Sequence, residues 1–135
     1  VIQPGQHGST FGGNPMGSSV AKTALEVIRD EKLTQNARTL GDLFRAQMNV
    51  YIADSKTVNL VRGRGLLNAI LINDTEDSKT ALNICLRLRD KGLLAKPTHG
   101  NIIRFAPPLV ITEEQLLDCI QIITSTLKEF EPSGS

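Results

Sequence analysis

A segment rich in glycine and hydroxyl residues, at positions 6–15, contains the first side chains in this chain that could do chemistry. Its glycines allow a backbone to approach a ligand closely and to adopt positive φ, and its hydroxyls can donate hydrogen bonds. The glycines are Gly8, Gly12 and Gly13, and the hydroxyls are those of Ser9 and Thr10. Asn14-Pro15 has the residue types of an N-cap and a first helical residue, and the N–H groups of such a helix start favour phosphate. The segment predicts an anion site, with plain chain reversal as the alternative.

Two common phosphate motifs do not fit this segment. No Gly-Lys-Ser/Thr sequence follows the glycines, so the segment is not a P-loop. No apolar strand precedes them within a βαβ unit, so it is not a dinucleotide-binding fingerprint either. The anion interpretation therefore depends on the hydroxyls and on the predicted helix start.

Arg104 is the second candidate, because its position in a predicted strand surrounds it with apolar residues. Strand periodicity places it on one face with Ile102 and Ala106. A guanidinium in such surroundings requires an anionic partner, and a bidentate clamp on a substrate carboxylate would provide one. A structural ion pair, or an edge residue that reaches solvent, is the alternative.

The remaining charged and titratable side chains give weaker indications. His7 and His99 lie in glycine-containing loops without Cys, Asp or Glu at ligand spacing, so no metal site is expected and both are interpreted as polar turn residues. Arg62 and Arg64 flank a glycine in a predicted turn and are assigned no catalytic role. Lys96 follows an apolar run, and we expect it to be partly buried.

The composition is typical of a single globular domain. The chain has 135 residues, of which 40% are hydrophobic, and its 15 Lys and Arg nearly balance its 14 Asp and Glu. No basic run reaches the length of a nucleic-acid or membrane patch, which argues against both kinds of partner.

The two cysteines and the chain ends bear on the compartment. Cys85 and Cys119 lie in apolar helical patterns and are interpreted as unpaired, buried residues, which favours a reducing, intracellular environment: the cytoplasm, with the mitochondrial matrix as the alternative. No stretch has the length of a membrane span and no signal-peptide pattern opens the sequence. Because Val1 is not an initiator Met, we expect the chain to be a fragment of a longer protein.

Hydrophobic periodicity predicts eight elements in the order helix, helix, strand, strand, helix, strand, strand, helix. Two helices are expected at residues 15–31 and 34–53, then strands at 57–62 and 66–72 around a turn at 63–65. A third helix ends at Gly92, extended structure follows at 93–95, a turn at 97–101, and a strand at 102–106. The last helix begins at the capping box formed by Thr112 and Gln115.

The same pattern predicts which faces are buried. The first helix is expected to present Met16, Val20, Ala24, Val27 and Ile28 to a core. The third is expected to bury Ala81, Leu82, Cys85 and Leu88, and the last Leu116, Leu117, Ile120, Ile123, Leu127 and Phe130. The predicted fold is α/β, with a small, mainly antiparallel sheet packed against helices.

Four sequence blocks, in order along the chain, resemble the class III pyridoxal-phosphate aminotransferases, and within them the ornithine aminotransferases. The blocks are Gly8-Ser9-Thr10-Phe11-Gly12-Gly13-Asn14-Pro15, Arg62-Gly63-Arg64-Gly65-Leu66-Leu67, Gly92-Leu93-Leu94-Ala95-Lys96-Pro97-Thr98-His99-Gly100 and Ile103-Arg104-Phe105-Ala106-Pro107-Pro108-Leu109. Together they cover almost the whole chain. The stretch from Ala95 to Gly100 favours ornithine aminotransferases over acetylornithine aminotransferases.

This resemblance implies the C-terminal small domain of a fold-type I aminotransferase subunit. It divides the chain into the end of the large domain with a phosphate-binding loop (1–14), helices that link to the small domain (15–53) and the small domain itself (54–135). In the family, the Schiff-base lysine, the aspartate at the pyridinium nitrogen and the aromatic residue that stacks on the ring all lie in the large domain. The resemblance therefore implies no catalytic residue in this chain, which by itself should be inactive.

Two roles transfer by motif position. Ser9 and Thr10 match the family segment that reaches the phosphate of pyridoxal 5'-phosphate in the partner subunit, which implies a homodimer. Arg104 matches the carboxylate-binding arginine. The implied reaction transfers the δ-amino group of ornithine to 2-oxoglutarate, giving glutamate semialdehyde and glutamate. Acetylornithine or another ω-amino acid as donor, or a non-catalytic dimerisation module, are the alternatives.

Overall fold

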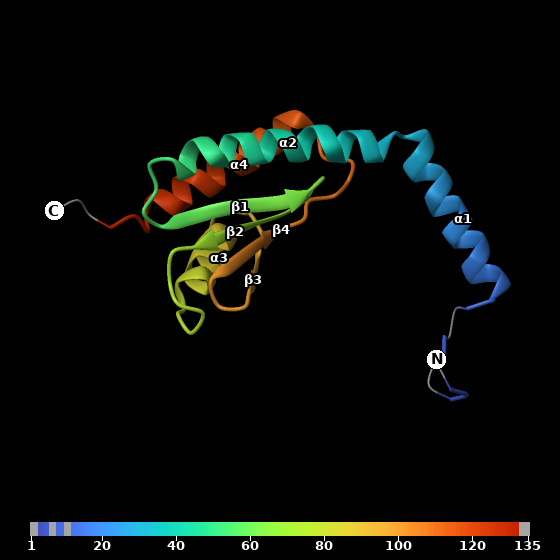
Figure 1. Cartoon of the computed structure of the whole chain (residues 1–135). Coiled ribbons are helices and arrows are strands. Elements are labelled where there is room, and N and C mark those ends of the chain that lie inside the picture. Colours follow the sequence, from blue (N-terminus) through green and yellow to red (C-terminus); the bar gives the residue numbers. More distant parts are fainter. Residues whose placement is uncertain (1–2, 6–7, 10–11, 133–135) are drawn as a thin grey trace. The chain divides into compact units, whose positions relative to one another are not determined.

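The computed structural model describes residues 3–5, 8–9 and 12–132 and contains the eight predicted elements in the predicted order (Figure 1). The chain divides into two compact units, Val1–Thr34 and Gln35–Ser135. The four-stranded sheet, with the helices packed on it, lies in the second unit. The division that the family resemblance implies, at residues 14 and 53, stays a prediction.

Helix α1 (Pro15–Asp30) begins as the sequence predicts. The side chain of Asn14 accepts a hydrogen bond from the N–H of Gly17, and Pro15 takes the first helical position. The expected burial of its apolar face is wrong, because no residue of α1 is buried and Met16 is 79% exposed. Among the described residues of the unit Val1–Thr34, α1 is the one long helix, and they provide no second apolar surface for that face.

The second unit consists of three helices and one antiparallel sheet. Its helices are α2 (Leu33–Ile52, whose first two residues belong to the first unit), α3 (Thr80–Asp90) and α4 (Glu113–Lys128). Its strands are β1 (Val58–Arg64), β2 (Leu67–Ile72), β3 (Lys96–Thr98) and β4 (Ile102–Phe105). They are ordered β1-β2-β4-β3, so β4 is central and β3 is an edge strand.

The turn between β1 and β2 lies later than expected. Gly63 and Arg64 belong to β1, and the chain turns at Gly65-Leu66, where Gly65 has a φ of 55°. Gly63 serves close packing inside the hairpin, because a β-carbon there would lie 2.3 Å from Oδ1 of Asn68. The glycines were correctly associated with the hairpin, but only Gly65 makes the turn.

The strand expected at 93–95 lies later, at Lys96–Thr98, so the segment expected as a turn at 97–101 begins as strand β3. Pro97 pairs with Ile103 of β4. An edge strand tolerates proline where the N–H would face solvent, because no hydrogen bond between strands is lost there. The turn starts at His99, which has a φ of 50° and is exposed, and continues through Gly100 with a φ of 74°. Lys96, expected to be partly buried, is exposed.

One face of the sheet forms the core with α2, α3 and α4, which lie beside it in Figure 1. Its fully buried side chains include Met48, Ile70, Ile84, Leu88, Ile103 and Leu127. Two predicted core residues are exposed instead: Leu82 of α3, where Ile84 is buried, and Leu117 of α4. The hydrophobic period was recognised correctly, but in each case one flanking leucine lies beyond the buried arc.

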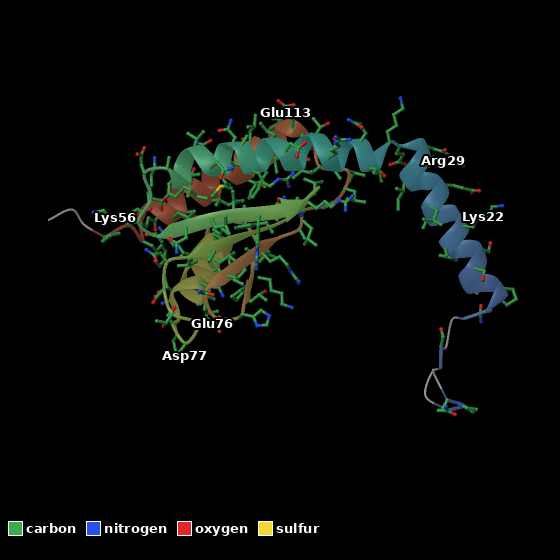
Figure 2. The ribbon with its side chains drawn as sticks, in the orientation of Figure 1. Lys22, Arg29, Lys56, Glu76, Asp77 and Glu113 are labelled. Carbon is green, nitrogen blue, oxygen red and sulfur yellow. The ribbon has the colours of Figure 1, made fainter. Side chains whose placement is uncertain are left out.

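The last helix is fixed at both ends. The capping box of Thr112 and Gln115 is confirmed, and Glu113, labelled in Figure 2, lies in the first turn where a negative charge favours the helix dipole. Just beyond the other end, the Glu129 carboxylate pairs with Arg87 and Lys91 from α3 and its C-cap. Hydrogen bonds from these two cations lower the pKa of Glu129 to about 2.

Among the residues that the structure describes, no helix is both long and apolar enough to cross a membrane.

Candidate functional site

Arg104 lies near the middle of the sheet, on the face that the helices leave open. Its strand neighbours Ile103 and Phe105 point into the core and are buried, whereas Arg104 is exposed. Alternation along a strand places successive side chains on opposite faces, so the buried neighbours fix the direction of Arg104. The predicted strand is confirmed except that it ends at Phe105, but the apolar surroundings expected for Arg104 are wrong, because its side chain is exposed; the predicted carboxylate clamp stays a prediction.

The pairing register places Arg104 in a row of residues that crosses all four strands. Arg62 pairs with Ala69, Ala69 with Arg104, and Arg104 with Lys96. We call these four residues the cation row, because three of them carry a positive charge. Directly paired residues project from the same face of a sheet, so the row lies on the open face.

The open face is basic. Every charged residue in the four strands is a cation, namely Arg62, Arg64, Lys96 and Arg104. The ion pairs within the described part of the chain involve other residues, on helices, at the C-cap of α3 and in the segment after α4. The face therefore offers concentrated positive charge to an anion, without carboxylates that compete for it.

An apolar cavity of about 310 Å³ lies on the helix side of the sheet and is separate from this basic face. Its lining includes Phe44, Phe105, Leu116 and Cys119, and no charged residue contributes to it within the described chain. Burial raises the pKa of Cys119 above its ordinary value, with the negative charge of Asp118 as a second cause. The cavity and the basic face lie on opposite sides of the sheet, and no lining residue carries a positive charge that would attract a carboxylate or phosphate, so the two regions are not one site.

The phosphate-binding candidate lies in the first unit, and of its two hydroxyl residues the structure describes Ser9. The Oγ of Ser9 accepts a hydrogen bond from the N–H of Gly12 at 2.8 Å, and Ser9 is exposed. Because its oxygen serves as acceptor there, its own hydrogen stays free to donate to an anion. Thr10 and His7 lie outside the described residues.

The charges around this loop favour an anion. No Asp or Glu occurs before Glu26, and the first turn of α1 contains no acidic residue. A β-carbon at Gly12 would lie 3.0 Å from both Cβ and Oγ of Ser9, so glycine permits this tight loop. The Ser9 hydroxyl and the absence of acidic residues before Glu26 are compatible with an anion at this loop, and the predicted phosphate site stays a prediction. No cluster of three or more His, Cys, Asp and Glu suited to a metal ion is present in the described part of the chain.

The neighbourhood of Arg104 was only partly visible to sequence reasoning. Lys96 was assigned to the approach to a turn, so its pairing with Arg104 was missed. A usable indication was Pro97, because a residue that precedes proline is restricted to extended conformations. The strand order, and with it the cation row, required the structure.

Comparisons with known proteins agree with this fold. The family model described as Aminotransferase class-III matches residues 1–127. A mitochondrial ornithine aminotransferase of Drosophila melanogaster is 56% identical over 93% of this chain and 28% of that protein. The ornithine aminotransferase of Saccharomyces cerevisiae is 55% identical over 92% of this chain and 30% of that protein.

Solved structures give the same result. The acetylornithine aminotransferase of Elizabethkingia anophelis is 64% identical with a TM-score of 0.86, over 96% of this chain and 32% of that chain. The ornithine aminotransferase of Plasmodium yoelii is 45% identical with a TM-score of 0.84, over 96% of this chain and 34% of that chain. The chain thus spans about 30% of the length of the relatives it matches. With a family model that matches nearly its whole length, the chain belongs to the class III aminotransferases.

Proposed function

We propose that this chain forms the C-terminal part of an ornithine δ-aminotransferase, which transfers the δ-amino group of ornithine to 2-oxoglutarate and yields glutamate semialdehyde and glutamate. In this proposal the intact protein contributes the Schiff-base lysine, and this chain contributes binding groups. Support comes from relatives named ornithine aminotransferase, 46–56% identical over more than nine tenths of the chain.

The position of Arg104 carries the proposal. It is exposed on a sheet face whose charged residues are all basic, and no described carboxylate forms an ion pair with it. A guanidinium binds a carboxylate through two parallel hydrogen bonds, which both holds and orients it. Arg104 is therefore the group that binds a carboxylate of 2-oxoglutarate during the acceptor half of the reaction.

The loop before α1 is proposed to bind the phosphate of pyridoxal 5'-phosphate through Ser9 and Thr10. The free hydrogen of the Ser9 hydroxyl and the lack of acidic residues before Glu26 support this assignment. When bound, this cofactor supplies the electron sink for transamination, and the protein supplies binding and orientation.

The same loop is proposed to act across a subunit boundary, so that the active form is a homodimer. The apolar side chains of α1 are consistent with this, since Met16, Val20 and Leu25 are each more than 60% exposed in the single chain. Exposed apolar surface of this kind indicates contact with another surface, which a second subunit or the remainder of the same subunit would provide.

A second donor, N-acetylornithine, is favoured by one observation. The Elizabethkingia anophelis structure, 64% identical to this chain, is that of an acetylornithine aminotransferase. The stretch from Ala95 to Gly100, which forms β3 and the following turn, favours ornithine instead.

A donor comparison on the intact protein decides between them. We expect a higher kcat/KM for ornithine than for N-acetylornithine, with 2-oxoglutarate as acceptor and the glutamate formed from it measured as the product common to both donors. A preference for N-acetylornithine would replace the proposed donor.

The non-catalytic alternative is tested on the 135-residue chain itself. Treatment with pyridoxal phosphate and borohydride should give no stoichiometric covalent adduct on this chain, whereas the intact protein should be labelled on one lysine. If Lys96 were labelled stoichiometrically, the catalytic lysine would not lie outside this chain. An intact protein that neither labels nor transaminates would support the dimerisation module.

A further inference from the structure

Lys96 and Arg104 are neighbours across two hydrogen-bonded strands. The register of β3 and β4 pairs Lys96 with Arg104 and Pro97 with Ile103. Directly paired residues have their β-carbons about 4.5–5.5 Å apart and share one face of the sheet. Since Ile103 is fully buried on the helix side, the Lys96 and Arg104 side chains both project from the open face.

This pairing brings together two like charges. Like charges directly opposite each other on neighbouring strands destabilise a sheet. No carboxylate in the described residues forms an ion pair with either side chain, and the acidic residues lie on helices and loops, as Glu76 and Asp77 do in Figure 2. An anion held between the two cations would remove this repulsion.

The other neighbours of Arg104 make Lys96 distinct within the cation row. On the opposite side Arg104 pairs with Ala69, whose methyl group leaves space beside the guanidinium. Arg62 stands one strand further away, and strands are spaced about 4.8 Å apart. Among the residues that pair directly with Arg104, Lys96 is the charged one.

The backbone also holds Lys96 in place. Because Pro97 follows it, Lys96 is restricted to extended conformations, and the proline ring fixes the next φ. The backbone of Lys96 thus has a defined position beside Arg104, from which its flexible side chain can bring the ammonium next to the guanidinium. A carboxylate has about four lone-pair sites, of which the guanidinium fork uses two, so an ammonium can occupy a third.

We propose that Lys96 supplies the second positive charge of the carboxylate site that Arg104 forms. This inference rests on the proposed function, which places a substrate carboxylate at Arg104. It adds a specificity-determining residue to that site, on the strand next to it.

The test uses the intact protein and glutarate, an unreactive dicarboxylate that competes with 2-oxoglutarate. We expect Lys96→Met to raise the inhibition constant of glutarate about tenfold, the size that the loss of a charge-assisted hydrogen bond produces. Lys96→Arg should restore binding to within about threefold, because it retains a cation with N–H donors at this position. If Lys96 had only a structural role, the loss of glutarate binding in Lys96→Met would come with a loss of thermal stability. Rescue by Lys96→Arg when both variants have equal thermal stability therefore indicates a direct role in binding.

Arg64→Met is the matched control, because Arg64 is a cation on the same face that pairs with Leu67 rather than with Arg104. It should leave the glutarate inhibition constant within about twofold, since exposed charges more distant from the ligand are screened by solvent and salt. If Lys96→Met unfolds the protein, Lys96→Gln, with a polar side chain, is measured in its place.

The outcomes separate the two proposals. A glutarate constant that rises in Arg104→Met but not in the Lys96 variants overturns the role of Lys96 and leaves the proposed function standing. A constant that is unchanged in Arg104→Met removes the carboxylate site itself. Equal effects of Lys96→Met and Arg64→Met would mean that the face attracts anions only through its total charge, which also overturns the specific role of Lys96.

Discussion

A β-carbon placed on Gly41 of α2 would lie 1.9 Å from the carbonyl oxygen of Gly65 in the turn between β1 and β2. Helix and hairpin therefore meet backbone against backbone at this point. The contact is reinforced by Arg45, one helical turn later, which donates to the carbonyl of Gly65 at 3.1 Å and to Oδ1 of Asn68 at 2.7 Å. This anchor fixes the hairpin whose strands carry half of the cation row.

We expect Gly41→Ala to destabilise the protein, although alanine is the better helix former. The gain in helix propensity is about 1 kcal/mol, and the overpacking cost is about 1–3 kcal/mol or more. The clash dominates because the obstructing atom is backbone, which cannot rotate away. Denaturant unfolding should show a lower free energy of unfolding for Gly41→Ala. The control Val50→Ala, at an exposed position on the same helix, should change it by no more than about 0.5 kcal/mol; a stabilised Gly41→Ala would contradict the contact.

Gly41 also illustrates what sequence alone could predict. A glycine inside a helical pattern signals a possible close approach, but the partner, Gly65, lies 24 positions later and no local pattern connects the two. Elements with strong local rules were predicted correctly: Asn14-Pro15 at the start of α1, the capping box of Thr112, and Gly92 with a φ of 87° after α3.

Errors occurred where tertiary packing overrode local rules. The pair Pro97-Thr98 has turn-like composition, yet pairing with Ile103 and Ile102 holds it as an edge strand. For the candidate site, Arg104 and its face followed from alternation, whereas its neighbour Lys96 depended on strand order, which is a non-local property. The role of Ser9 and Thr10 in phosphate binding stays a prediction.

The Glu131 carboxylate connects the end of α4 to the end of α2. It accepts hydrogen bonds from the hydroxyls of Tyr51 and Ser55 and, at 2.9 Å, from the backbone N–H of Lys56. Burial raises the pKa of Glu131, but these hydrogen bonds outweigh it and the net shift is downward. Burial, followed by the hydrogen bond to Glu131, raises the pKa of Tyr51 well above its usual value, so the phenol stays a donor.

Glu131→Gln should therefore lower the free energy of unfolding at pH 7 by about 1.5–3 kcal/mol, the range for hydrogen bonds to a charged group. A depressed carboxyl pKa contributes stability that is complete above the unfolded-state pKa and is lost as the pH falls through the folded-state pKa. The difference between wild type and Glu131→Gln should thus shrink as the pH is lowered below the ordinary range for glutamate. Urea titrations at several pH values measure it, with Asp77→Asn in an exposed loop as the control; a difference independent of pH would argue against ionised Glu131 as the acceptor.

Replacing the loop hydroxyls should weaken cofactor binding by the intact protein. We expect Ser9→Ala and Thr10→Ala each to raise the dissociation constant of pyridoxal phosphate about tenfold, because each removes a hydrogen bond to a charged phosphate. Ser18→Ala, an exposed hydroxyl within α1, is the control and should leave the constant unchanged. Equal affinity of all three variants and the wild type would refute the assignment.

A mixed dimer tests whether this loop acts on the partner subunit. One subunit carries the Ser9→Ala and Thr10→Ala changes, and the other lacks the Schiff-base lysine but keeps the loop intact. If the loop serves the neighbouring subunit, this hybrid retains one complete site and about half of the wild-type activity. A loop that serves its own subunit would leave the hybrid with no complete site, and the activity would fall to that of the loop variant alone or lower.

Arg104→Ala should impair the acceptor half of the reaction far more than folding. Loss of a charge-assisted carboxylate contact is worth about 1.5–3 kcal/mol, which corresponds to a decrease of about ten- to 150-fold in kcat/KM for 2-oxoglutarate. Arg62→Ala is the matched control, since Arg62 lies in the same cation row but does not pair with Arg104. The exposed position of Arg104 predicts a thermal unfolding midpoint close to that of the wild type, so the kinetic loss would not reflect unfolding. If kcat/KM for 2-oxoglutarate were equal in Arg104→Ala and Arg62→Ala, the basic face would attract the acceptor without a specific clamp at Arg104.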